Sequence, residues 1–168
     1  MATLGRTLRH LSTGRALLQR RFPAHTLKAI EQAIRDCESR HAGEIRFAVE
    51  ARLHGRATLA GHTPRARAIE VFSQLRVWDT EHNNGVLIYV LLADHAVEIV
   101  ADRGVAGGRV PQAEWDTVCR LIERHFAAGD FEQGAVAGVR AVAELLGRHP
   151  AGPRNGRNEL PDTPVLLA

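Results

Sequence analysis

Four oxygen-bearing side chains stand at two places in the sequence that a folded sheet would bring together. Asp79, Glu81 and Asn84 lie in one polar loop directly before an apolar run over residues 86–93, and Asp102 ends the strand-like run that follows. If the two runs pair as antiparallel neighbours, the start of the first and the end of the second meet at one edge of the sheet. Carboxylate and amide oxygens suit Ca²⁺ or Mg²⁺ better than zinc. The spacing therefore predicts a divalent-metal site at this rim.

The same residues also have a structural interpretation. Asp79 and Asn84 are suited to cap turns by bonding their side chains to nearby backbone groups, and Asp102 is suited to cap the loop after it. Arg103 and Arg109 follow in that loop and are the candidates for a phosphate contact. No nucleophile paired with a base is evident, so the sequence identifies no catalytic residue.

Motifs of several enzyme classes are missing. The sequence has no P-loop, no GxGxxG, no GxSxG, no HExxH and no CxxC pair. His82 and His95 fall in turns, where exposure is the simpler expectation. Cys37 and Cys119 sit on apolar helical faces without metal-ligand spacing, which predicts two buried free thiols.

Charge is unevenly distributed along the chain. Residues 1–30 carry six Lys and Arg and no acid, which leaves 16 basic against 19 acidic residues in the remainder. The basic character thus belongs to the N-terminal arm, and a nucleic-acid-binding surface over the domain is not expected. No apolar run approaches the roughly 20 residues of a membrane helix, and no secretory signal is evident. We therefore expect a cytoplasmic protein without a transmembrane span.

The arm itself allows three interpretations. Residues 1–21 could form a short basic amphipathic helix with Leu4, Leu8 and Leu11 on one side. Such a segment packs on its domain, makes a weak contact with a membrane surface or an unknown protein partner, or serves as an organelle transit peptide. We favour packing on the domain.

The remaining sequence alternates helical and strand-like patterns. A helical face over residues 27–37 leads to a strictly alternating strand over 45–53, with one apolar and one polar side. Thr63-Pro64 marks the start of the next helix, and Trp78 is expected to plug the junction with the central strand. Two more helices follow, the second opened by a capping box at residues 130–133. Gly134 and Gly138 on it suggest close packing against the sheet.

This order predicts the fold class. An eight-residue strand with no polar face must be covered on both sides. We predict an α/β fold in which helices sandwich a small mixed central sheet. The expected divisions are a basic arm over residues 1–22, the α/β domain over 23–147 and an extended tail over 148–168 whose apolar end lies against the domain.

Several stretches resemble the TPM domain family, which is named after a thylakoid-lumen phosphatase and related proteins. They are Gly43-Glu44-Ile45, residues 67–72, Asn84-Gly85-Val86-Leu87 and residues 98–102. The resemblance covers residues 24–147. Trp78-Asp79-Thr80, residues 101–104 and Glu159-Leu160-Pro161-Asp162 make it closest to a compact bacterial form without a membrane anchor.

The resemblance implies an α/β sandwich, a divalent-metal site and weak acid-phosphatase activity, while other members act as accessory modules of membrane assemblies. Many relatives carry a signal peptide and a membrane anchor, neither of which is evident here. Many also have glycine where this strand ends in Asp102, so the phosphatase activity does not simply carry over. Two hypotheses stand: a soluble binding or accessory module with Ca²⁺ or Mg²⁺, and a metal-dependent phosphomonoesterase in which Asp79 and Asp102 hold the ion.

Overall fold

The computed structural model describes residues 5, 6, 10, 13–53, 61–154 and 156–167. Its regular elements in chain order are α2 (Arg15–Arg21), α3 (Ala24–Glu38), β1 (Glu44–Glu50), α5 (Pro64–Gln74), β2 (Gly85–Leu91), the 3₁₀ turn η1 (Leu92–Asp94), β3 (Ala96–Ala101), α6 (Arg103–Ala106), α7 (Gln112–Ala127), α8 (Phe131–Arg148) and β4 (Val165–Leu167).

The four strands form one mixed sheet in the order β3-β2-β1-β4. β1 runs parallel to β2, with Glu44 opposite Gly85, and parallel to β4 on its other side. β2 and β3 are antiparallel, with Val86 opposite Ala101. The predicted α/β class, the mixed sheet and the antiparallel pairing of the second and third strands are confirmed.

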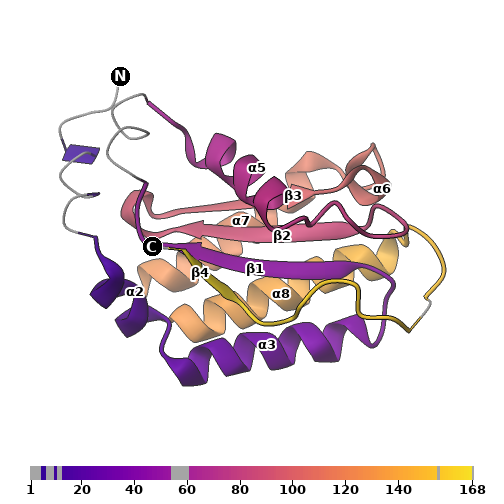
Figure 1. Ribbon diagram of the computed structural model, residues 1–168, viewed down its shortest axis with the longest axis horizontal. Coiled ribbons are helices and arrows are strands. Elements are labelled where there is room, and N and C mark those ends of the chain that lie inside the picture. The colour runs from indigo at the N-terminus through magenta and orange to yellow at the C-terminus, as the bar shows by residue number, and fades with distance from the viewer. Residues whose placement is uncertain (1–4, 7–9, 11–12, 54–60, 155, 168) are drawn as a thin grey trace.

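The sheet is covered on both faces, as the apolar run of β2 requires. Figure 1 shows α3, α7 and α8 as a layer on one face, while α5 lies against the other. Alternate residues of β2 divide between two cores: Val86, Ile88 and Val90 join the larger one, whereas Leu87, Tyr89 and Leu91 join the one beneath α5. Every residue of β2 is buried.

The first strand differs from its prediction. Alternation along β1 indicated one buried side and one polar side that is either solvated or makes cross-strand ion pairs, but all seven residues are buried. Glu44, Arg46 and Glu50 occupy the polar side. They are covered by α5 and by the C-terminal tail, and their charges are met by partners within the protein. A period of two identifies which side chains share a face, but not what later packs upon it.

Three local predictions were wrong. Trp78 is 48% exposed, and the fully buried Val77 fills the junction before β2 instead. Asp130 precedes α8 but makes no side-chain capping bond. Gly138 lies against Ile122 of α7, where an added Cβ would come within 2.4 Å of that side chain, so helix–helix packing rather than helix–sheet packing explains this glycine. By contrast, Thr63 caps α5 as predicted, accepting a bond from the Ala66 N–H at 3.1 Å.

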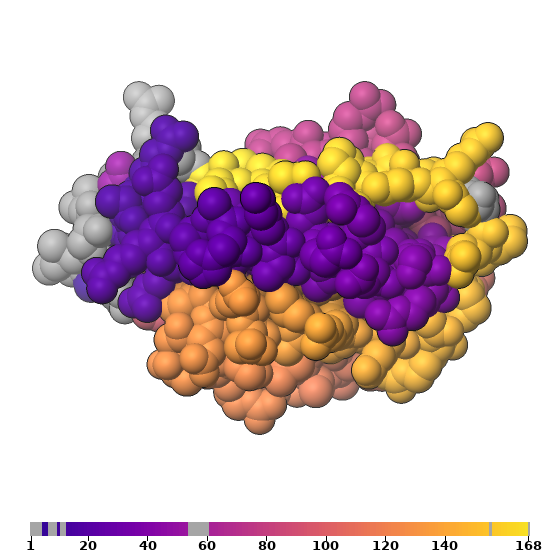
Figure 2. All heavy atoms as spheres, turned by 90° about the horizontal axis from the view of Figure 1, so that it is seen from below, coloured from indigo at the N-terminus to yellow at the C-terminus, as the bar shows by residue number. Residues whose placement is uncertain are grey.

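Both ends of the described chain contact the domain. Leu18 of α2 and the following Phe22 are buried in the larger core. The tail runs next to α3, as Figure 2 shows, and its end pairs with β1 as β4, which confirms the expected extended conformation. Within the described residues, no helix combines the length and apolarity needed to cross a membrane.

Candidate functional site

The predicted rim is formed where β1 and β2 begin and β3 ends. Asn84, directly before β2, is almost fully buried. Its amide nitrogen donates to the Ala42 carbonyl, its backbone N–H donates to the Thr80 hydroxyl at 3.1 Å, and its carbonyl accepts from the Glu44 N–H at 3.2 Å. Its side-chain oxygen, Oδ1, is buried without a hydrogen-bond partner within the described residues. The rim thus contains an acceptor that the described protein groups leave unsatisfied.

Asp102 stands at the end of β3, on the strand next to β2. Its backbone N–H donates to the Gly85 carbonyl at 2.9 Å, which fixes it beside the start of β2. One carboxylate oxygen, Oδ1, caps α6 by accepting from the Arg103 N–H at 2.7 Å. The other, Oδ2, is buried and has no partner in the described part of the chain. Asp102 therefore acts as the predicted cap and still carries a second unsatisfied buried oxygen.

The other two predicted ligands are differently placed. Asp79 is exposed and pairs with Arg76 at 2.8 Å, a partner one turn earlier. Glu81 is also exposed, and its backbone N–H donates to the Glu159 carboxylate of the tail at 2.8 Å. Asn84 and Asp102 thus lie at one edge of the sheet, whereas the Asp79 carboxylate is engaged in an ion pair at the surface.

The two candidate phosphate-binding arginines follow Asp102. Arg103 opens the four-residue helix α6 and is exposed. Arg109 is exposed as well, and its guanidinium donates to the Pro150 carbonyl at 3.1 Å. This contact holds Arg109 against the beginning of the tail.

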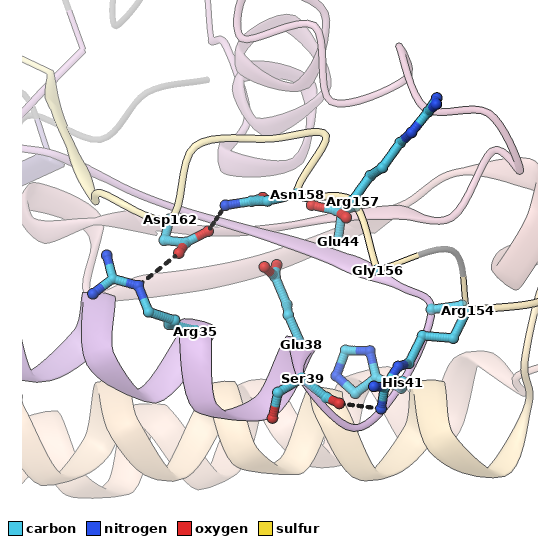
Figure 3. Close-up of a pocket in the computed structure, with 11 residues that line it drawn as sticks. Arg35, Glu38, Ser39, His41, Glu44, Arg154, Gly156, Arg157, Asn158 and Asp162 are labelled. Atoms are coloured by element: carbon cyan, nitrogen blue, oxygen red, sulfur yellow. Dashed lines mark hydrogen bonds and ion pairs between the residues drawn. The ribbon is translucent and has the colours of Figure 1, made fainter.

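A carboxyl cluster adjoins the rim on the side of α3. Figure 3 shows the Glu38 side chain rising from the end of α3 toward Asp162 of the tail and Glu44 of β1. They line a polar cavity of about 290 Å³ between α3 and the tail. Glu38 accepts from the Ile45 N–H at 2.7 Å, and Glu44 accepts from the Leu160 N–H at 3.1 Å. Asp162 accepts from Arg35 of α3 at 3.3 Å, so the cluster fixes the tail to the domain.

The surroundings of this cluster shift the pKa values of its carboxyl groups. Burial raises the pKa of Glu38 to about 9, opposed by the Ile45 N–H and reinforced by the Glu44 and Asp162 carboxylates. Burial also raises the pKa of Glu44, against the hydrogen bonds from the tail backbone. Glu38 is therefore protonated at neutral pH. Arg46, which reaches the Pro161 and Thr163 carbonyls, supplies a positive charge among these acids.

A histidine of the same cavity is held neutral. The Nδ1 atom of His41 accepts from the Gly43 N–H at 3.1 Å. Burial lowers the pKa of His41 to about 4, with that hydrogen bond acting against the shift and Arg40 adding to it. Its Nε2 is buried without a partner within the described residues. A neutral imidazole with Nδ1 as acceptor carries its proton on Nε2, which makes this atom an unused donor.

The cavity and the rim are two parts of one edge of the sheet. Ala42 lines the cavity and accepts the hydrogen bond from Asn84, and Glu44 lines the cavity and donates its N–H to Asn84. Local sequence patterns did not indicate Glu38 or His41 as site residues, and they placed Glu44 on a polar strand face. The resemblance carried by Glu159-Leu160-Pro161-Asp162 was the available signal, because those residues close the cavity.

The two cysteines of the chain are not activated as nucleophiles. Burial raises the pKa of Cys119 to about 12 and also raises that of Cys37, so both thiols stay protonated. Within the described ranges, no group of three or more His, Cys, Asp and Glu side chains is arranged to hold a metal. A cation here would therefore need amide, carbonyl and water oxygens besides carboxylates, which is a ligand set that Ca²⁺ and Mg²⁺ accept.

Comparison with known proteins agrees with this architecture. The chain is similar to the solution NMR structure of BA42 protein from the psychrophilic bacterium Bizionia argentinensis sp. nov., at 34% sequence identity and a TM-score of 0.73, covering 85% of this chain and 93% of that one. No curated protein matches the chain. A family model described as the TPM domain matches residues 19–145, which is well over half of the sequence. The chain therefore belongs to the TPM domain family.

Proposed function

We propose that this TPM domain is a binding or accessory module that takes a divalent cation, Ca²⁺ or Mg²⁺, at the rim around Asn84 and Asp102. The observation that carries the proposal is a pair of buried oxygens that no described residue satisfies, Oδ1 of Asn84 and Oδ2 of Asp102, at the ends of adjacent strands. Leaving a buried acceptor unsatisfied costs about 1–3 kcal/mol. A bound cation with its water shell would satisfy both.

The ligand set proposed here is narrower than the one expected from the sequence. Asp79 is left out because its carboxylate already pairs with Arg76 at the surface. With one carboxylate and one amide oxygen, the site would leave much of the coordination shell to water. We therefore propose weak binding by a hydrated ion rather than a tight all-protein cage.

The phosphomonoesterase alternative has less support. It needs a second anionic ligand such as Asp79 at the metal, but Asp79 pairs with Arg76 at the surface. It also needs an arginine for the phosphate, and of the two candidates Arg109 contacts the Pro150 carbonyl. It would be supported if turnover of an aryl phosphate required metal and fell at least tenfold in Asp102→Asn. Activity that survives this substitution in pure protein would count against it.

Thermal melting with and without cation tests the binding proposal. A ligand that binds only the folded state, present at ten times its Kd, stabilises that state by about 1.4 kcal/mol. For a protein of this size, the melting temperature should rise by roughly 3–6 °C. The shift should be present in millimolar Ca²⁺ or Mg²⁺ and absent in EDTA.

Two substitutions make the test specific. Asp102→Asn keeps a capping oxygen but removes the charge, so the cation-dependent shift should largely vanish. Asp79→Asn removes an equal charge from the same loop region and should leave the shift intact. A melting temperature unaffected by Ca²⁺, Mg²⁺ and Mn²⁺, or an equal loss of the shift in both variants, would contradict a site at Asp102.

A further inference from the structure

A second cavity lies at the opposite end of the sheet from the rim. It has a volume of about 700 Å³ and is bordered by α2, by the turn between β2 and β3, and by the junction of α7 with α8. This volume is within the range of small-molecule sites. Figure 1 shows these elements together at the end of the molecule where β2 finishes. We call it the distal cavity.

The wall of the distal cavity is mainly apolar. Its apolar side chains come from segments distant in sequence and include Leu17, Val90, Leu92, Phe126 and Phe131. The rings of Phe126 and Phe131 are stacked, with centroids 4.8 Å apart. Both rings are partly exposed although they pack against the main core. A wall of this kind favours an aliphatic chain, because each buried methylene raises affinity about fourfold.

A cationic group stands beside this wall. The Arg21 guanidinium lies over the Phe131 ring, 4.7 Å from its centroid, and Arg21 makes no ion pair with the described residues. Glu123, the one carboxylate among the described lining residues, instead accepts a hydrogen bond from the Val97 N–H of β3 at 3.2 Å. The Arg21 guanidinium is thus available to pair with a ligand, while the Glu123 carboxylate is hydrogen-bonded within the protein.

A neighbouring polar cavity indicates where the head of a ligand would lie. This open basin of about 470 Å³ shares Arg21, Gly129 and Phe131 with the distal cavity. Its other charged lining residues are Arg20, His25, Asp130 and Glu132. Glu132 is engaged within the protein, because it accepts a hydrogen bond from the Thr26 hydroxyl at 2.9 Å and lies 3.7 Å from the His25 ring nitrogen. Arg21 therefore stands between an apolar chamber and a solvated polar one. An amphiphile could place its chain in the first and its head beside Arg21.

We propose that the distal cavity binds a single-chain amphiphile with an anionic head, of the medium-chain carboxylate class. The chain lies against Leu17, Val90 and the Phe126–Phe131 stack, and the carboxylate pairs with Arg21. This proposal is independent of the cation site, since it uses none of the same residues.

Decanoate, studied below its micelle concentration, is the probe. Titration followed by amide chemical shifts should move signals of Leu92, Ala96 and Gly129 and leave those around Asn84 unchanged. Affinity should rise about fourfold per methylene from hexanoate to decanoate. Decyltrimethylammonium, with the same chain and the opposite charge, should bind more weakly than decanoate.

Two pairs of variants test separately the contribution of the anionic head and that of the aliphatic chain to binding. Arg21→Gln should weaken decanoate binding about three- to fivefold, the effect of losing an exposed ion pair, whereas Arg124→Gln on the exposed face of α7 should not. Ala128→Trp should fill the cavity and weaken binding about tenfold or more, whereas Ala113→Trp at the other end of α7 should bind normally. Melting curves check that each variant is folded.

Several results would overturn the proposal. They are the absence of shifts around the distal cavity, affinity that does not increase with chain length, stronger binding of the cationic amphiphile, and equal affinity of Ala128→Trp and Ala113→Trp. The mapped shifts and the chain-length series use the unmodified protein, so a variant that fails to fold does not prevent a decision.

Discussion

The Arg6 guanidinium forms a two-pronged ion pair with the Asp94 carboxylate, at nitrogen–oxygen distances of 2.7 to 3.1 Å, across 88 positions of sequence. His10 adds a bond from its Nε2 to the same carboxylate at 3.0 Å and accepts the Leu53 N–H with Nδ1 at 3.0 Å. These contacts attach the N-terminal arm to the turn between β2 and β3. At least part of the arm's positive charge is therefore already paired within the domain.

Removing the Asp94 charge should destabilise the protein. Burial by itself would raise the pKa of Asp94 in the folded state. The hydrogen bonds from Arg6 and His10 outweigh this effect, so the pKa of Asp94 is lowered. A carboxyl with a depressed folded pKa contributes stability above its unfolded pKa, and that contribution is lost as pH falls through the folded value. We expect Asp94→Asn to lower the free energy of unfolding by about 1–3 kcal/mol at pH 7 and by less in acid. Urea unfolding at both pH values measures this, with exposed Asp116→Asn as the control.

Deleting residues 1–21 tests the role of the arm as a whole. The deletion removes the Arg6–Asp94 ion pair and the buried Leu18, so we expect a lower melting temperature. If the arm serves only to pack on the domain, binding to anionic vesicles should be negligible before and after deletion. Salt-sensitive vesicle binding that the deletion abolishes, without loss of stability, would instead support a membrane-surface contact.

A buried network beneath α5 should be sensitive to the loss of one partner. Glu50 is only 1% exposed. Its carboxylate accepts a hydrogen bond from the Tyr89 hydroxyl and forms an ion pair with the Arg67 guanidinium, at nitrogen–oxygen distances of 2.8 and 3.0 Å. Arg67→Leu leaves a buried carboxylate without its counter-ion and should cost about 3–5 kcal/mol. The double variant Glu50→Leu with Arg67→Leu should recover much of this loss. A double variant less stable than Arg67→Leu alone would show that the network, not the stranded charge, supplies the stability.

Glu38 should make stability fall as pH rises. Burial raises the pKa of Glu38 to about 9 in the folded state, against 4.5 for an ordinary glutamate. Between these values the folded protein holds a proton that the unfolded chain has released, so the free energy of unfolding falls by up to about 1.4 kcal/mol per pH unit. Glu38→Gln should flatten this decline and stabilise the protein at pH 8. Denaturant midpoints from pH 5 to 9 test this, and an unchanged slope in Glu38→Gln would refute the assignment.

Gly104 should be intolerant of a side chain because of the loop that carries Asn84. A Cβ at Gly104 would lie 2.3 Å from the His82 carbonyl oxygen and 2.4 Å from that of Asn83, both backbone atoms. Gly104→Ala should cost about 1–3 kcal/mol and weaken any cation-dependent rise in melting temperature. Gly147 in α8 has open space around its Cα, so Gly147→Ala should be neutral or stabilise by up to about 1 kcal/mol. Equal stability of the two variants would disprove the steric argument.

Features that depend on local periodicity were predictable. The apolar run of β2 required cover on both faces, which fixed the α/β class, and Thr63-Pro64 correctly marked the start of α5. The antiparallel return through Asp94 and His95 placed Asp102 beside the start of β2. These signals work because the period and the turn residues report the faces and ends of a single element. Cation binding, a protein partner and a cytoplasmic location remain predictions.

The composition of the candidate site depended on contacts between distant segments. Glu44 was expected on a polar strand face, either solvated or in a cross-strand ion pair. Instead, the tail returns across 116 positions so that the Leu160 N–H donates a hydrogen bond to the Glu44 carboxylate. The same return places Asp162 beside Glu38, and burial then raises the pKa of Glu38. Sequence alternation determined that Glu44 and Arg46 share one face of β1. Only the tertiary structure decided that this face is covered. The pairing of β4 with β1 and the packing of α5 bring together segments that are distant in sequence, and the local pattern of one segment does not indicate its contact with another.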